Sequence, residues 1–220
     1  MTVLAIAAVC ELLLGARVLL RNPRAALNQA FFLVATWVAV WVGVNALIVS
    51  GANDTPNVAY RVAYATGPFI AGSFLVFSWV FPYLRHRFRT SSLAGIFSVA
   101  VGFALMLLLT DAVVEGVTRS DEVWAVTIGP YFFAYVIWFS ALFLTAFYEL
   151  TQKLRTSDGV HRRAITYVLA SASIPFITNM VTDILLPLFR GKSELWMVSI
   201  GPESSLIWLA LMSWVILKKT

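Results

Sequence analysis

Long apolar runs separated by short polar loops constrain this chain more than any other feature of its sequence. A helix needs about 20 consecutive, mostly apolar residues to cross the hydrocarbon core of a bilayer. Runs of that length cover approximately residues 2–20, 27–49, 58–84, 91–111, 123–148, 163–187 and 196–217. The pattern therefore predicts an all-α integral membrane protein, a bundle of seven transmembrane helices that forms a single domain over residues 1–220.

The composition excludes an ordinary soluble domain. Hydrophobic residues make up 60% of the chain and charged residues only 12%, whereas soluble domains are about 25% charged. The net charge of +5 comes from basic residues in short loops, which is typical of membrane proteins and does not indicate a nucleic-acid partner. We expect a multi-pass protein of the bacterial inner (plasma) membrane whose constant partners are lipids. The single cysteine, Cys10, excludes an intrachain disulfide.

The distribution of basic residues predicts the orientation of the bundle. The loops after the first, third and fifth runs, together with the C-terminus, hold twelve of the sixteen basic residues: Arg17, Arg21, Arg24, Arg85, Arg87, Arg89, Lys153, Arg155, Arg162, Arg163, Lys218 and Lys219. Loops rich in Lys and Arg stay in the cytoplasm. The N-terminus is therefore predicted to lie outside the cell and the C-terminus in the cytoplasm.

Polar side chains recur toward the predicted outer ends of several helices. Asn179 and Asp183 are spaced i and i+4 in the sixth run, so they share one helix face. Polar groups at such depth should face protein or a water-filled cavity rather than lipid. We predict an outward-facing ligand pocket lined by Asn45, Arg61, Tyr64, Tyr131, Asn179, Asp183 and Glu203.

Two further expectations concern charge in this region. Arg61 would neutralise Asp183 or Glu203, as a buried carboxylate requires. The alternative is that these residues are boundary charges in contact with headgroups and water, and the sequence leaves both interpretations open. The sixth run is interrupted by Pro175, which makes it our candidate for a mobile helix.

Glu11 stands near the middle of the first run, where burial of an acid is expensive. We expect it to be hydrogen-bonded to a neighbouring helix. A role in proton relay is the alternative.

The sequence offers no set of catalytic residues. Its two histidines, His86 and His161, lie in predicted cytoplasmic loops and have no metal-ligand spacing. A Gly-rich phosphate loop and a G-x-S-x-G motif are both missing, and the last two runs contain no lysine that could carry a Schiff base. We therefore expect no catalytic activity, no bound metal and no cofactor.

Three stretches of the chain resemble the N-terminal seven-transmembrane region of bacterial histidine kinases, a membrane sensor module. The first is LLRNPRAALNQAFF, with Arg21, Asn22, Pro23, Asn28 and Phe31. The second is RRAITYVLASASIPFITNMVTDILLP, with Arg163, Tyr167, Thr178, Asn179 and Pro187. The third is SLIWLALMSWVILKKT, the close of the seventh run.

This resemblance implies a sensory receptor for an external or in-membrane small molecule, which signals through the seventh helix to a cytoplasmic kinase or another membrane partner. The sequence stops at Thr220, just past that helix, so the kinase is expected either on a continuation of the chain or on a separate partner. A homodimer is left open. The alternatives are a small transporter or permease that uses Glu11, Asp183 and Glu203 as coupling sites, and a structural subunit of a membrane complex.

Overall fold

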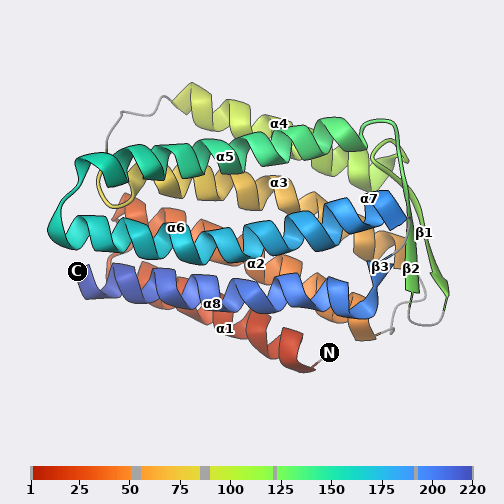
Figure 1. The fold of residues 1–220 in the computed structure, drawn as a ribbon, viewed down its shortest axis with the longest axis horizontal. Helices are drawn as coiled ribbons and strands as arrows, with labels where there is room; N and C mark the ends of the chain where they lie inside the picture. Colours follow the sequence, from red (N-terminus) through yellow and green to blue (C-terminus); the bar gives the residue numbers. More distant parts are fainter. Residues whose placement is uncertain (1, 51–55, 85–89, 121–122, 191–192, 220) are drawn as a thin grey trace.

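The computed structural model describes residues 2–50, 56–84, 90–120, 123–190 and 193–219. Seven of its helices are long and apolar enough to cross a membrane, as the apolar runs predict (Figure 1). In chain order the elements are α1 (Thr2–Arg21), α2 (Ala26–Ser50), α3 (Pro56–Val80), α4 (Thr90–Leu109), β1 (Val114–Ser120), β2 (Val123–Ile128), α5 (Phe132–Thr156), α6 (Gly159–Asn179), the π-helical turn η1 (Met180–Leu185), α7 (Leu186–Arg190), β3 (Ser193–Glu194) and α8 (Leu195–Lys219).

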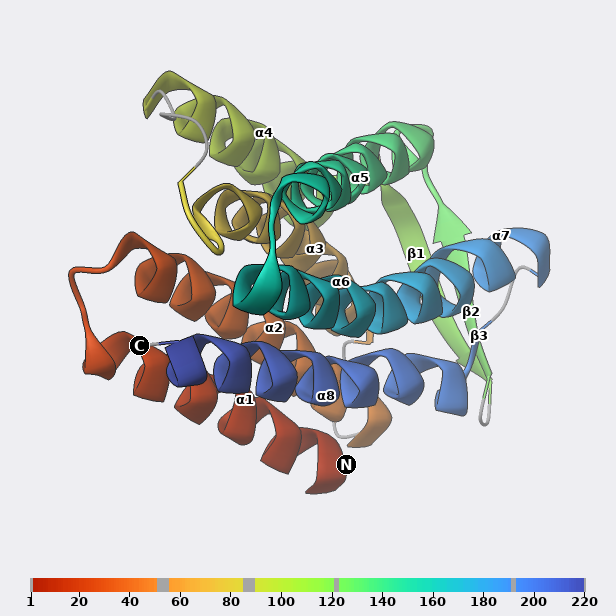
Figure 2. The same ribbon diagram turned by 60° about the vertical axis from the view of Figure 1, so that its left-hand side comes forward.

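The long helices lie side by side, with the loops that join them at the two ends of the bundle (Figures 1 and 2). Helix α3 is the central one, with 67% of the residues in its most apolar part buried, whereas α4 lies at the edge with only 11% of such residues buried. Exposed large side chains such as Ile137 and Leu144 point away from the bundle. Such an apolar outer surface suits contact with lipid. The helices also satisfy their own backbone hydrogen bonds, as a surrounding without water requires.

The start of the fifth apolar run is strand and not helix, which corrects the predicted span of 123–148. Residues 123–128 form β2, which pairs with β1 in an antiparallel hairpin and with the short β3. The segment is rich in Val, Ile and Thr, residues that favour strands. Helix α5 begins only at Phe132, after Gly129 and Pro130.

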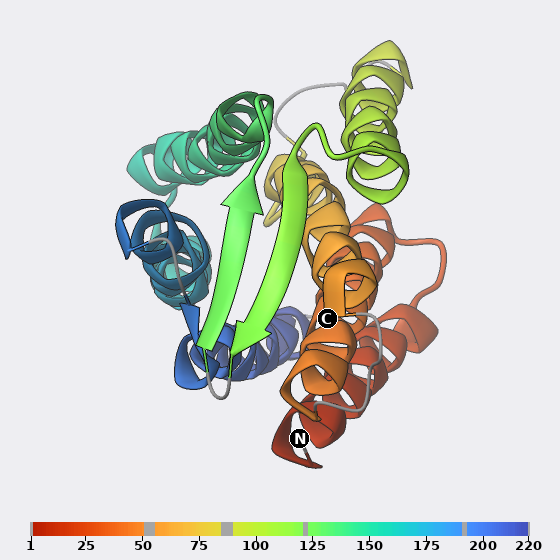
Figure 3. The ribbon, with the colours of Figure 1, turned by 90° about the vertical axis from the view of Figure 1, so that its right-hand side faces the viewer.

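The hairpin lies across one end of the bundle (Figure 3). Val114, Val117 and Val126 are buried there against residues of α2 and α3. This end, called the hairpin end below, is the one at which α2 finishes and α3 begins. The loops after α1, α3 and α5 and the end of α8 lie at the opposite end, called the basic end; three of its predicted cations, Arg85, Arg87 and Arg89, fall outside the described residues.

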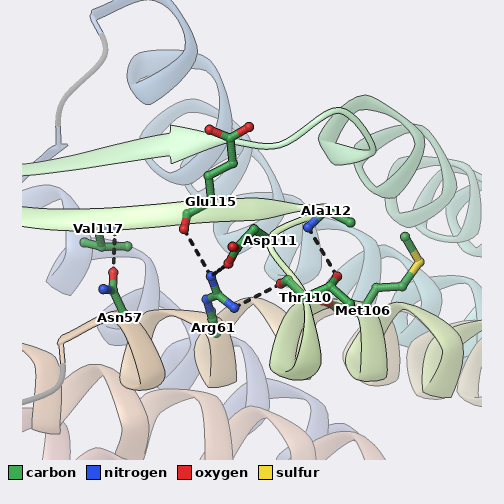
Figure 4. A network of polar contacts seen from close by, with 8 residues as sticks. All are labelled: Asn57, Arg61, Met106, Thr110, Asp111, Ala112, Glu115 and Val117. Carbon is green, nitrogen blue, oxygen red and sulfur yellow. Dashed lines mark hydrogen bonds and ion pairs between the residues drawn. The ribbon is translucent and has the colours of Figure 1, made fainter.

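Arg61 joins α3 to the hairpin, as Figure 4 shows. Its guanidinium forms an ion pair with Asp111 and donates to the backbone oxygens of Thr110, at 2.9 Å, and Glu115, at 3.1 Å. Asn57, one turn earlier on α3, accepts a hydrogen bond from the backbone N–H of Val117. The expectation that Arg61 neutralises Asp183 or Glu203 is therefore wrong, because Arg61 is turned toward the hairpin.

At the basic end, side chains satisfy the carbonyl groups that helix termini leave without partners. Asn28 of α2 donates to the Val18 oxygen of α1 at 2.8 Å, and Arg21 donates to the Leu217 oxygen of α8 at 2.8 Å. Both contacts tie helix ends together where the chain leaves the apolar region.

The most extensive of these contacts is made by Lys153, in the last turn of α5. Its side chain is fully buried, and its ammonium donates to the backbone oxygens of Ser78, Trp79, Phe81 and Tyr83 at 2.8–2.9 Å. The first two carbonyls belong to the last turn of α3 and the other two to the segment that follows it, and a cation is favourable at a helix C-terminus. The sequence-based assignment of Lys153 to a cytoplasmic loop is therefore wrong: the residue is a buried cap between two helices.

Candidate functional site

A cavity of about 100 Å³ lies inside the bundle, between α2, α3, α5, α6 with η1, and α8. Its walls are largely apolar and aromatic, and its polar groups come from a few side chains. The lining residues include Trp41 and Asn45 of α2, Tyr60 and Tyr64 of α3, Tyr135, Phe139 and Phe143 of α5, Asn179 and Asp183 of the sixth span, and Ser205 and Trp208 of α8. Small-molecule sites commonly combine an apolar wall with a few placed polar groups.

Four of the seven predicted pocket residues line this cavity: Asn45, Tyr64, Asn179 and Asp183. Asn45 comes from α2, Tyr64 from α3, and the other two from the sixth span, more than 100 residues later. The pair Asn179 and Asp183 faces inward together, as the i, i+4 spacing predicts.

The other three predicted residues do not line the cavity. Arg61 belongs to the hairpin contact described above. Tyr131 precedes the first residue of α5 and is 54% exposed. Glu203 is exposed because α8 turns Ser205 and Trp208 inward, which places residue 203 on the opposite face.

The turn that carries Asp183 is irregular for a reason visible in the sequence. Pro187 has no N–H, so it cannot donate to the carbonyl four residues earlier, that of Asp183. The hydroxyl of Tyr64 on α3 donates to this carbonyl instead, at 2.9 Å. The chain around it is a π-helical turn, a feature that is frequent at functional sites. This turn begins at Met180, five residues after Pro175, and the mobility expected of the sixth helix stays a prediction.

The same arrangement occurs on α3. Pro68 cannot donate to the carbonyl of Tyr64, and the hydroxyl of Tyr135 on α5 donates to that carbonyl at 2.9 Å. Gly67 makes room for this contact, because a Cβ at that position would collide with the Tyr135 hydroxyl. Two tyrosine hydroxyls therefore link α5 to α3 and α3 to η1 in series.

The carboxylate of Asp183 has a local partner but no counter-ion among the residues that the structure describes. Thr182 donates to its Oδ1 at 2.9 Å. Across the residues that the structure describes, no basic side chain lies within salt-bridge distance of Asp183. A carboxylate at the wall of an apolar cavity is expensive without a cation or several donors.

Glu11 makes the interhelical contact that we expected. It is fully buried on α1, and the Ser205 hydroxyl of α8 donates to its Oε1 at 2.6 Å. Ser205 also lines the cavity, so a change at the cavity wall can reach α1 through one hydrogen bond. A proton-relay role for Glu11 stays untested.

Asn179, the last residue of α6, lies against α8. Gly201 of α8 faces it, and a Cβ at residue 201 would fall on the Asn179 side-chain oxygen. This oxygen is buried and has no hydrogen-bond partner among the described residues. The close approach of Asn179 to α8 therefore depends on glycine at position 201, which has no Cβ.

We expect Gly201→Ala to destabilise the bundle by about 1–2 kcal/mol, because the new methyl group forces the Asn179 side chain to rotate. The control is Gly95→Ala on α4, where no atom lies within 4 Å of the added Cβ; it should be neutral or stabilising by about 0.5–1 kcal/mol. Thermal unfolding in detergent micelles measures both. Equal stability of the two variants would show that α6 and α8 are not in close contact at Gly201.

Several residues of the site were missed by sequence reasoning. Trp41 and Trp208 are ordinary apolar residues of their runs, and Ser205 is one serine among many. The sequence did give a signal for the tyrosine contacts, because Pro68 and Pro187 each leave the carbonyl four residues earlier without its usual backbone donor. No group of His, Cys, Asp and Glu suited to a metal ion occurs in the described part of the chain.

Comparison with known proteins agrees with the geometry of the bundle. The model of one protein family, the N-terminal 7TM region of histidine kinases, matches residues 3–219. No curated protein and no solved structure matched the chain. The match covers nearly all of the sequence, including every helix that lines the cavity. The chain therefore belongs to the family of N-terminal seven-transmembrane regions of histidine kinases.

Proposed function

We propose that this chain is a sensory module that detects a small molecule in the cavity and signals through α8 to a kinase or another cytoplasmic partner. The observation that carries the proposal is the composition of the cavity wall, to which α6, η1 and α8 all contribute. A ligand shifts a two-state equilibrium by its differential affinity for the two arrangements. A molecule in this cavity touches the irregular turn and the last helix together, so it can favour one packing of α6 against α8.

We propose that the chain lies in the inner membrane of a bacterium. The hairpin end is then outside the cell and the basic end is in the cytoplasm. The excess of Lys and Arg at the basic end supports this orientation. The polar lining residues Asn45, Tyr60 and Asp183 then lie toward the outer half of the membrane. A ligand would reach them from outside or from the outer leaflet, and the signal would leave through the opposite end of α8.

A matched pair of alanines on α6 tests this function. Ala172 lines the cavity and is buried, whereas Ala170, two residues earlier, is exposed on the outer face. Ala172→Leu fills the cavity, so we expect it to lock the output in one state. Basal phosphorylation of the partner kinase in native membranes should change about fivefold or more, the smallest effect usual for allosteric coupling, and should no longer vary with growth conditions.

Ala170→Leu adds the same side chain on the lipid-facing surface and should leave phosphorylation unchanged. If folded Ala172→Leu protein gave the same phosphorylation as the wild type and Ala170→Leu, the cavity would have no part in signalling and the proposal would fail.

A further inference from the structure

We infer that the ligand of the cavity is a small amphiphile with a protonated amine head and an apolar, ring-sized body. This inference rests on the proposed function, because it names the chemical class that the sensory cavity binds. It follows from the charge, the hydrogen bonding and the shape of the lining.

The charges around the cavity favour a cation. Asp183 is the one acidic residue among the lining residues, and none of them is basic. Arg61, the counter-ion expected from the sequence, is held by Asp111 and by two backbone oxygens of the hairpin region. An ammonium group in the cavity would supply a positive counter-charge for Asp183. A carboxylate or phosphate would instead place two negative charges together in a site of low dielectric.

The tyrosine hydroxyls favour a hydrogen-bond donor. Each hydroxyl has a single hydrogen, and Tyr64 and Tyr135 already use theirs on the carbonyls orphaned by Pro187 and Pro68. Their oxygen lone pairs remain, so both groups can only accept from a ligand. Asn45 likewise donates one amide hydrogen to the Trp41 oxygen at 2.9 Å. An ammonium, with three hydrogens and no acceptor, fits this set.

The remaining lining sets the body of the ligand. Phe139, Phe143, Phe176 and Trp208 give the wall aromatic faces that suit an apolar body, and such faces also attract a cation within about 6 Å. The cavity volume of about 100 Å³ is somewhat smaller than the roughly 150 Å³ of an apolar cavity that binds benzene in another protein. A single ring or a short alkyl chain therefore fills it, and modest adjustment of side chains admits the amine.

Three probes that share one ring and differ in the head group test the inference: benzylamine, benzyl alcohol and benzoate. Binding is measured by calorimetry on the full chain in nanodiscs of phosphatidylglycerol. We expect benzylamine to bind about tenfold or more tightly than either analogue, since truncating one partner of a buried charge pair costs at least that much. Tighter or equal binding of benzyl alcohol or benzoate would overturn the inference, and so would the failure of all three probes to bind.

Two carboxylates provide the matched variants. Asp183→Asn keeps the shape of the side chain and removes the charge at the cavity, so benzylamine affinity should fall about tenfold or more. Glu203→Gln removes a charge from the exposed face of α8 and should leave the affinity unchanged. An equal effect of both variants would mean that the amine is attracted by the surface and not by the cavity.

An amine head can belong to a free molecule or to the ethanolamine headgroup of a lipid. Adding phosphatidylethanolamine to the nanodiscs separates these sources. If the natural ligand is the lipid headgroup, phosphatidylethanolamine competes with benzylamine and weakens its binding. If the natural ligand is a free amine, phosphatidylethanolamine leaves benzylamine binding unchanged. Once benzylamine is found to bind more tightly than its analogues, competition identifies a lipid headgroup as the source, and the absence of competition identifies a free amine. The kinase test with Ala172→Leu is independent of head-group chemistry, so the amine inference can fail while the sensory function stands.

Discussion

Lys153→Met is expected to destabilise the protein by about 3–5 kcal/mol, or to prevent its accumulation in the membrane. The lysine is completely buried and donates to the oxygens of Ser78, Trp79, Phe81 and Tyr83 at the end of α3. Pro82 has no N–H to offer the Ser78 carbonyl four residues earlier. Methionine fills similar space but removes the hydrogen bonds that the ammonium donates to these carbonyls, and the loss of such bonds in an apolar surrounding is costly.

The matched control is Arg155→Met, two residues later on α5, where the side chain is exposed. It removes one positive charge from the same helix end and should change stability by less than about 0.5 kcal/mol. Unfolding of both purified variants in mixed micelles, followed by circular dichroism, gives the comparison. Equal stability of Lys153→Met and Arg155→Met would mean that Lys153 does not cap α3.

Tyr135→Phe is expected to cost about 1–3 kcal/mol, because it leaves the Tyr64 carbonyl of α3 without a donor. The proline that orphans this carbonyl offers a direct rescue. Pro68→Ala restores a backbone N–H at the position that normally donates to residue 64. In the Pro68→Ala background, Tyr135→Phe should therefore cost less than half as much, and a double-mutant cycle of unfolding free energies measures the difference.

Tyr148→Phe serves as the control for this cycle, since Tyr148 lies on the same helix and is 61% exposed. Its effect should be small and independent of residue 68. If the cost of Tyr135→Phe were the same with proline and with alanine at position 68, the tyrosine would contribute through packing and not through the orphaned carbonyl.

The fold was largely predictable because lipid permits few alternatives. A run of apolar residues long enough to span a bilayer has to be a helix there, and each of the seven runs contains one. The error came at residues 123–128, where an apolar stretch continues into α5 without a charge to mark the boundary. Hydropathy does not distinguish an apolar strand that packs on the end of a bundle from the first turns of a transmembrane helix, whereas the content of Val, Ile and Thr does give a signal.

The site was predictable only in part, because depth in the membrane does not determine which face of a helix looks inward. Asn179 and Asp183 share a face through their spacing, and both line the cavity. Arg61 and Glu203 lie on helices that line the cavity but are rotated away from it, by one residue from Tyr60 and by two from Ser205. Lys153 looked like a loop cation, since nothing in its local sequence shows that the end of α3 packs beside it.

The most direct test of the account is the distance between α6 and α8, measured by pulsed electron paramagnetic resonance on the full chain in nanodiscs. In a Cys10→Ser background, spin labels at Val160→Cys and Leu211→Cys report from exposed positions on the two helices. We expect Ala172→Leu, which fills the cavity, to shift the distance distribution, and Ala170→Leu to reproduce the wild-type distribution. Identical distributions for all three proteins would contradict this account, because a cavity whose occupancy leaves α6 and α8 unmoved cannot pass a signal through α8.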